Sequence, residues 1–195
     1  MFRFIPAALL LTSLAHAEVP AVVEAAPPSP HAWALETELV QPFVPTVGII
    51  RLRGARTLWG TPGGLRGDLL VGAFLRPGIE HEIVERINEY LLTVGYRQYV
   101  WRGAHVEVEL DAGWAWGTNR IDGKLYSNPS VLLNVNAGYR FGFFEPGGFF
   151  DNGSAVGFFV TPQVGVIQGL STNIGPRGGR PDTFLSGSLL VGLSF

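Results

Sequence analysis

The sequence predicts an all-β protein, an eight-stranded antiparallel up-and-down β-barrel that crosses a membrane, and three observations predict it. First, 47% of the 195 residues are hydrophobic and only 15% are charged, below the quarter usual in soluble domains. Second, past the N-terminus no apolar run reaches the roughly 18–20 residues of a membrane helix. Third, apolar residues recur at every second position, which is typical of strands whose two faces meet different surroundings.

The alternation is clearest in the closing stretch 182–195, DTFLSGSLLVGLSF. Counting back from Phe195, one parity carries Leu193, Val191, Leu189 and Leu185, while the other carries mainly serine and glycine. The stretch is about as long as a tilted strand that crosses a bilayer, roughly 9–11 residues. We therefore expect a last strand with one face in lipid and the other in a polar interior.

Composition also excludes several classes of function. The formal net charge is −2, so there is no basic field and we expect no nucleic-acid partner. The chain has no cysteine, which excludes disulfides, thiolate metal sites and cysteine nucleophiles.

The first 32 residues are predicted to precede the barrel. Met1–Ala17 has the pattern of a signal peptide: Arg3 supplies the positive charge, a short apolar run follows, and Ala15-His16-Ala17 forms a small-x-small cleavage site. Residues 18–32 contain four prolines and read as a flexible leader, the alternative being a tether or a ligand for a partner. The barrel itself is expected over residues 33–195.

Eight alternating segments are the predicted strands, and they are Trp33–Pro42, Val47–Leu58, Gly67–Arg76, Glu89–Trp101, His105–Trp116, Val131–Phe143, Ala155–Gln168 and Thr183–Phe195. One parity of each is apolar and is expected to face outward, including Leu35, Leu52, Val71, Leu75, Leu92, Val94, Tyr96, Val108, Leu110, Trp114, Leu133, Val135, Tyr139, Phe158, Val160, Val164 and Val166.

The opposite parity is polar and is expected to line the interior. The predicted network comprises Glu36, Glu38, Arg51, Arg53, Arg97, Tyr99, Glu107, Glu109, Asp111, Asn134, Asn136 and Arg140, with Asp68, Thr161, Gln163, Ser186 and Ser188 beside it. An eight-stranded barrel is only wide enough for its own side chains, and buried charges need partners. We therefore predict a paired network that fills the interior, the alternative being the lining of a conduit.

Two hairpins pair these charges, because residues directly opposite in an antiparallel pair share a face. A four-residue loop at Phe43–Thr46 sets Glu38 opposite Arg51 and Glu36 opposite Arg53.

The hairpin after Trp101 pairs a second set. A two-residue loop would set its acidic side chains among apolar ones. A three-residue loop at Arg102–Ala104 instead predicts Arg97 opposite Glu109 and Tyr99 opposite Glu107.

An even number of strands brings both ends of the barrel to the same side. The connections Trp59–Arg66, Arg102–Ala104 and Gly142–Ser154 are expected on that side, with Trp33, Trp59 and Trp101 forming an aromatic girdle. The other side is expected to hold Phe43–Thr46, Pro77–Asn88, Gly117–Ser130 and Gly169–Asp182. Two segments stay open: Gly78–Tyr90 as a short helix or as strand, and Gly142–Ser154 as a long loop or as an extension of the strands.

The signal segment, the alternating strands and Phe195 at the end resemble the small eight-stranded outer-membrane barrels of Gram-negative bacteria, the group around outer membrane proteins A, X and W. The resemblance covers Trp33–Phe195 and is architectural. It implies export into the bacterial outer membrane, contact with lipopolysaccharide and phospholipid, and recognition of Phe195 by the barrel-assembly machinery.

Barrels of this architecture include anchors, adhesins, small-ligand channels and lipid-modifying enzymes, so the fold does not decide the function. Our leading hypothesis is a non-enzymatic structural or interaction protein that works through its outer loops. The alternatives are a narrow channel or small-ligand carrier and, third, a lipid A-modifying enzyme; a soluble lipocalin-like barrel is the rival fold. The sequence does not indicate an oligomeric state.

No catalytic residue, cofactor or metal site is predicted. Glu107 and Glu109 resemble an acid–base pair but are explained by a neighbouring arginine, and His105 has no serine near it in sequence. Glu80-His81-Glu82 with Glu85 could chelate a cation, but their spacing matches no known site and we interpret them as a solvated loop.

Overall fold

The computed structural model describes residues 31–44, 47–80, 84–171 and 183–195. The expected signal segment, and the leader except for His31 and Ala32, lie outside these residues. The elements are β1 (Trp33–Glu38), a 3₁₀ turn η2 (Gln41–Phe43), β2 (Ile50–Gly60), β3 (Arg66–Ile79), β4 (Val84–Trp101), β5 (Ala104–Asn119), β6 (Leu125–Tyr139), β7 (Phe141–Phe143), β8 (Gly157–Ser171) and β9 (Thr183–Ser194). No helix among the described residues is long and apolar enough to cross a membrane.

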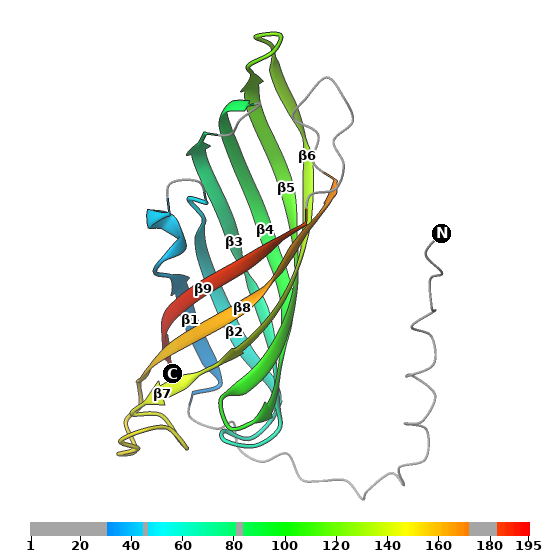
Figure 1. The fold of residues 1–195 in the computed structure, drawn as a ribbon. Helices are drawn as coiled ribbons and strands as arrows, with labels where there is room; N and C mark the ends of the chain where they lie inside the picture. The colour runs from blue at the N-terminus through cyan, green and yellow to red at the C-terminus, as the bar shows by residue number, and fades with distance from the viewer. Residues whose placement is uncertain (1–30, 45–46, 81–83, 172–182) are drawn as a thin grey trace, which may run out of the picture.

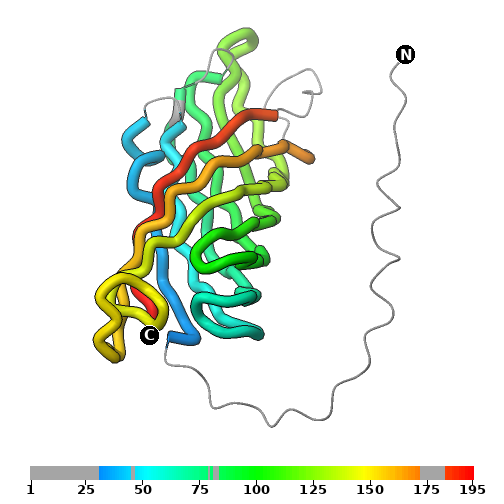
Figure 2. Tube along the Cα trace, turned by 60° about the horizontal axis from the view of Figure 1, so that its bottom comes forward, coloured from blue at the N-terminus to red at the C-terminus, as the bar shows by residue number. Residues whose placement is uncertain are grey.

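The strands form one antiparallel sheet that closes on itself (Figure 1). β1 pairs with both β2 and β9, and β6 pairs with both β5 and β8, so the described sheet has no free edge along these strands. Figure 2, with the lower end turned forward, shows β6, β8 and β9 crossing in front of the strands β2–β5. The all-β class and the antiparallel up-and-down order are therefore confirmed.

The sheet has nine strands because one predicted strand is broken. β6 and β7 are separated only by Arg140, and both pair with β8. The register on either side, Gly138 opposite Gln163 and Phe141 opposite Val160, would set Tyr139 opposite Pro162. A proline has no N–H to donate to the ladder, and this accounts for the interruption.

Most of the long strands run beyond their predicted ends. β4 begins at Val84 rather than Glu89, and β3 continues to Ile79, so the described part of Gly78–Tyr90 is largely strand, not helix. β1 is shorter than predicted, because the chain leaves the sheet at Glu38. The Glu38 carboxylate accepts hydrogen bonds from the backbone N–H groups of Val40 (3.1 Å) and Gln41 (3.3 Å), which holds the turn that follows.

The first hairpin has the predicted register, with Glu36 opposite Arg53. The second does not: Arg97 lies opposite Glu107 rather than Glu109, and Tyr99 lies opposite His105 rather than Glu107.

The reason for this error is a bulge. The register shifts between Tyr99 and Trp101, so Val100 is an extra residue in β4 and the turn is the two-residue Arg102-Gly103. A bulge sets two residues of one strand against one of its partner, which restores the parity that a regular two-residue turn would break. Arg102 has a positive φ of 48°, as tight hairpin turns require. The faces were thus predicted correctly and the pairs were wrong by two residues.

The two faces of the sheet differ sharply. The outward side chains named above are exposed or half-exposed, for example Val108 at 45%, whereas the predicted interior network is buried. The interior also holds two apolar clusters that the sequence reasoning did not predict. The cluster nearer the first residue of β1 is Ala34, Ala55, Leu70 and Phe159, and the second is Ile49, Phe74, Leu91, Leu132 and Ile167.

Candidate functional site: a buried charge network

Five charged side chains meet at the centre of the ring, and we call them the charge network: Glu36, Arg53, Arg97, Glu107 and Glu109. Arg97 Nη2 lies 2.7 Å from a Glu36 oxygen and 2.6 Å from a Glu107 oxygen. Arg53 lies 2.7 Å from Glu36 and 2.8 Å from Glu107, and it also contacts Glu109. Each side chain of the network is at most 1% exposed, so these are charge-assisted hydrogen bonds shielded from water.

Four strands supply the network, and glycines make room for it. Gly72 on β3 lies opposite Arg53, and a Cβ there would come within 2.9 Å of the Arg53 Cγ. Gly95 on β4 lies opposite Glu109, and a Cβ there would come within 2.8 Å of the Glu109 Cγ. Each of these two long charged side chains therefore extends into the interior beside a glycine, which has no side chain, on the neighbouring strand.

Further inward groups extend the network toward the second apolar cluster. Arg51 Nη1 lies 3.9 Å from Glu109, and its guanidinium lies over the Phe74 ring at 5.4 Å from the centroid. Asp111 accepts hydrogen bonds from the Thr93 hydroxyl and the Asn134 amide.

An apolar cluster lies on either side of the network along β3. On β3, Gly72 faces Arg53, while Leu70, two residues before it, belongs to the first cluster. Phe74, two residues after it, belongs to the second cluster. Leu70 and Phe74 are 0% and 1% exposed. The charges therefore lie between two buried apolar clusters on this strand.

A second polar group ties together the end of the ring where β1 begins. His31 Nδ1 lies 3.0 Å from the Ser194 hydroxyl, and that hydroxyl donates to Glu145 at 2.7 Å. Glu145 also accepts two hydrogen bonds from Arg140, at 3.1 and 2.6 Å, and the Arg140 guanidinium lies 3.6 Å from the centre of the Phe159 ring. This clamp joins the segment before β1, the last strand and the loop after β7.

The clamp lowers the pKa of the Glu145 carboxyl. Burial raises the pKa of the Glu145 carboxyl, but the adjacent Arg140 guanidinium outweighs burial and holds that pKa below its usual range. A cavity of about 430 Å³ lies beside the clamp, lined among others by Arg66, Tyr99 and Glu145. Arg66 lies over the Tyr99 ring, 4.0 Å from its centroid.

The His–Ser–Glu group of the clamp has the wrong order for nucleophilic catalysis. In a catalytic triad the histidine accepts the serine proton and the acid orients the histidine. Here the Ser194 hydroxyl donates to Glu145 directly, and it is 0% exposed. The geometry is that of a structural tie.

The remaining candidates for chemistry are also held by structural contacts. His105 packs against Tyr99, with ring centroids 5.2 Å apart, and its Nδ1 lies 3.0 Å from the Gly103 carbonyl. Glu107 and Glu109 are held by arginine rather than poised beside a substrate cavity. Within the described ranges no group of His, Cys, Asp or Glu is arranged to hold a metal ion.

The structure brings together only part of the predicted network. Glu38 lies outside it, accepting from backbone N–H groups that include that of Leu189 at 3.0 Å. Arg140 belongs to the clamp, and Asn136 donates to Glu107 at 3.3 Å.

Sequence reasoning missed both Glu89 and the clamp. Glu89 is 3% exposed and accepts from the Ser130 hydroxyl. Its parity is that of Arg97 on the same strand, a signal that could have identified it as inward. The clamp had no such signal, because His31 and Glu145 lie outside the strands.

Comparison of the chain with protein-family models, with curated proteins and with solved structures finds no match.

Proposed function

We propose that this chain is an integral outer-membrane β-barrel with a sealed polar interior, and that it has a structural or interaction role through its outer loops. It is not an enzyme in this proposal. β6 and β7 together count as one interrupted strand, so the barrel has the eight strand positions typical of small outer-membrane barrels.

The observation that carries the proposal is that charged side chains lie inside the ring and apolar side chains lie outside, the reverse of a soluble protein. The network is buried, while the outward side chains across the middle of the wall are apolar, among them Leu52, Val71, Val94, Val108, Val135 and Val164. In water this arrangement would expose apolar surface without cover and bury charge at a cost. In a bilayer the same wall faces hydrocarbon, and closure leaves no backbone group of an edge strand in lipid.

Aromatic residues at both ends of the wall support the same orientation. Trp33, Trp59 and Trp101 are 50%, 47% and 62% exposed at the end where β1 begins. At the other end Trp114 is 48% exposed, and Tyr90 stacks on Trp116 with centroids 5.0 Å apart. Aromatic belts at the two interfaces are typical of membrane barrels.

The interaction role rests on the hairpin between β5 and β6, which rises above the other connections in Figure 1. Its tip carries Arg120, Asp122 and Lys124, and Ile121 is 78% exposed. We assign this end to the cell exterior, because it is opposite the end that holds the first residue of β1 and the last of β9.

The sealed interior favours this role over a channel. The inward side chains of the charge network and of the two apolar clusters are at most 7% exposed, so they fill the interior and leave little room for a conduit. We expect planar bilayers that contain the protein to stay silent. Discrete conductance steps would support the channel instead, and altered lipid A mass spectra in cells that produce the protein would support an enzyme.

Membrane insertion is tested by placing a charge on the wall. Val108→Arg sets an arginine at mid-wall, where we expect a loss of roughly 2–4 kcal/mol in the free energy of unfolding from lipid vesicles. Ile121→Arg, at the exposed hairpin tip, is the control and should change it by less than about 0.5 kcal/mol. If the two variants unfold alike, the wall does not face hydrocarbon and the proposal fails.

A further inference from the structure

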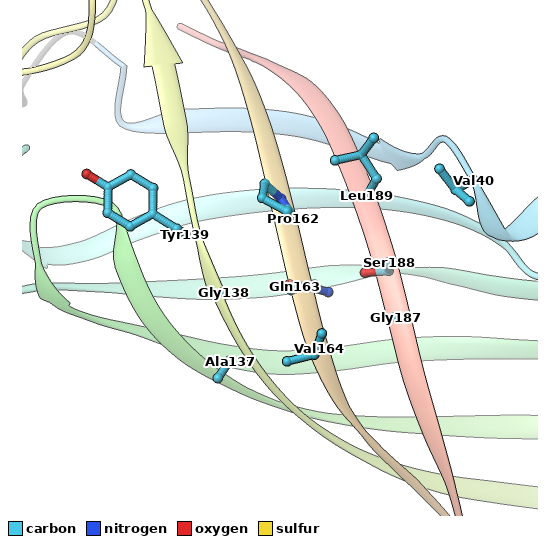
Figure 3. A pocket seen from close by; sticks show the side chains of 10 residues that line it. All are labelled: Val40, Ala137, Gly138, Tyr139, Pro162, Gln163, Val164, Gly187, Ser188 and Leu189. Atoms are coloured by element: carbon cyan, nitrogen blue, oxygen red, sulfur yellow. The ribbon is translucent and has the colours of Figure 1, made fainter.

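A cavity of about 430 Å³ lies at the end of the ring where β1 begins, and its volume is within the range of small-molecule sites. Its lining comes from the connection between β2 and β3, the turn between β4 and β5, and the segment around β7, which Figure 1 shows at the same end of the sheet. A larger depression crosses the outer face of β6, β8 and β9, but no charged side chain lines it (Figure 3). Of these two hollows, only the first therefore offers charge to a ligand.

Positive charge predominates around this cavity. Three guanidinium groups line it, those of Arg66, Arg102 and Arg140, against one carboxylate, that of Glu145. Glu145 pairs with Arg140 at 2.6 Å, and Arg66 pairs at 3.1 Å with Asp68, which is not part of the lining. Within the part of the chain that the structure describes, no carboxylate pairs with Arg102. Three cations against two carboxylates leave an excess of one positive charge, and Arg102 carries it.

Two of these guanidinium groups are held in place by packing. That of Arg66 lies over the Tyr99 ring, 4.0 Å from its centroid, and that of Arg140 lies over the Phe159 ring at 3.6 Å. Arg140 is only 7% exposed and Tyr99 only 1%. Because a planar guanidinium that is already held loses little side-chain entropy when it binds, both groups are suited to receive an anion.

Glycines allow the connections around the cavity to approach one another. A Cβ on Gly142 would overlap the Glu145 carboxylate, so the carboxylate packs directly on the backbone there. Gly63 and Gly147 meet from two different connections, since a Cβ on Gly147 would lie 3.7 Å from the Gly63 Cα. At these positions backbone rather than side chains therefore bounds the cavity.

We infer that this cavity binds a small soluble organic anion through its phosphate or carboxylate group. The oxyanion lies at Arg102 and shares Arg66 and Arg140 with their carboxylates, because guanidinium N–H groups match the oxygens of both kinds of anion. The organic part lies against the Tyr139 and Phe149 rings, which line the same cavity. A cation would meet three guanidinium groups, and an apolar ligand would remove their water without replacing its hydrogen bonds. The inference goes beyond the proposed function and does not depend on it, because the cavity belongs to the closed sheet and its connections.

The unpaired Arg102 allows a matched test of the site. Arg102→Met removes the guanidinium, and Arg102→Lys keeps the charge but not the planar fork. Arg102 is exposed and lies over the Trp101 ring, 5.1 Å from its centroid, so neither change disturbs the interior. Arg56→Met is the control, because Arg56 is also exposed and lies over the Trp33 ring at 5.1 Å, but it does not line the cavity.

Calorimetric titration of the full chain in a neutral detergent measures the binding. The probes are glucose 6-phosphate and glucuronate, with glucose and glucosamine as the neutral and cationic analogues of the same ring. We expect at least one of the two anions to bind with a Kd below about 1 mM, more weakly as the salt concentration rises, and neither analogue to bind detectably. Arg102→Met should weaken the binding about ten- to a hundredfold, Arg102→Lys about three- to tenfold, and Arg56→Met less than about twofold.

Failure of both anions to bind would overturn the inference, and so would glucose that binds as tightly as they do. An equal loss of affinity in Arg102→Met and Arg56→Met would also overturn it, because the anion would then be held by exposed arginines in general and not by the cavity. Circular dichroism of each variant should match that of the unchanged protein, which separates a loss of binding from a loss of fold.

Discussion

Removing Arg97 should destabilise the protein more than removing any exposed charge. Arg97 makes hydrogen bonds to both oxygens of Glu36, at 2.7 and 3.1 Å, and its Nε donates to Glu107 at 2.7 Å. Arg97→Met leaves both carboxylates buried with Arg53 as their remaining cation. Because breaking a buried pair by removing one partner costs about 3–5 kcal/mol, we expect a loss of that size.

The assay is urea unfolding of the vesicle-inserted protein, followed by tryptophan fluorescence. Arg120→Met is the matched control, since Arg120 makes an exposed pair at 3.8 Å with Glu80, worth at most about 1 kcal/mol. Adding Glu107→Gln to Arg97→Met should recover part of the loss, because it removes an uncompensated charge. A loss no larger than that of the control would refute the reasoning that these charges are dry and mutually dependent.

Three further predictions follow from single contacts. Glu145→Gln should lower stability at neutral pH but not at low pH. The depressed pKa of Glu145 stabilises the fold above the unfolded pKa of about 4.3, and this stabilisation is lost as the pH falls through the folded pKa. A difference in urea midpoint that does not change with pH would contradict this. Pro162→Val should supply an N–H to the Tyr139 carbonyl, raise stability by roughly 0.5–1.5 kcal/mol and slow amide exchange in β7; unchanged exchange would show that proline does not cause the break. Gly72→Ala should cost about 1–3 kcal/mol, because its Cβ would meet the Leu52 carbonyl oxygen and the Cα and Cγ of Arg53. Gly54→Ala, whose Cβ has its nearest atom at 3.8 Å, should be nearly neutral, and equal urea midpoints would argue against this packing.

The period of two was enough to predict that the four best-paired charges face inward. Glu36, Arg53, Arg97 and Glu107 all lie on the predicted face, because alternation depends only on the strand being extended. The partner of Arg97 was predicted wrongly, since pairing also depends on the turn. A bulge at Val100 adds one residue without altering any local pattern in the sequence.

The apolar clusters escaped prediction for a different reason. Phe74 and Leu91 lie on the inward parity, next to outward residues that are just as apolar, so those stretches of β3 and β4 do not alternate. A continuous apolar run carries no information about which of its members face inward. The clamp of His31 and Glu145 depends on loop geometry, which periodicity does not describe.

The charge network does more than fill space, because it gives the native register of the strands a lower energy than shifted registers. A slip of one residue between β4 and β5 would turn Glu107 to the outer face, and a slip of two would keep the face but part it from Arg97. The apolar outward residues alone do not distinguish the native register from a slip of two, since Val106, Val108 and Leu110 are nearly equivalent. The buried charge pairs remove that ambiguity, because a shifted register leaves a buried carboxylate without its guanidinium. The polar interior thus specifies which closed sheet forms, while in the proposed function the apolar exterior places that sheet in lipid.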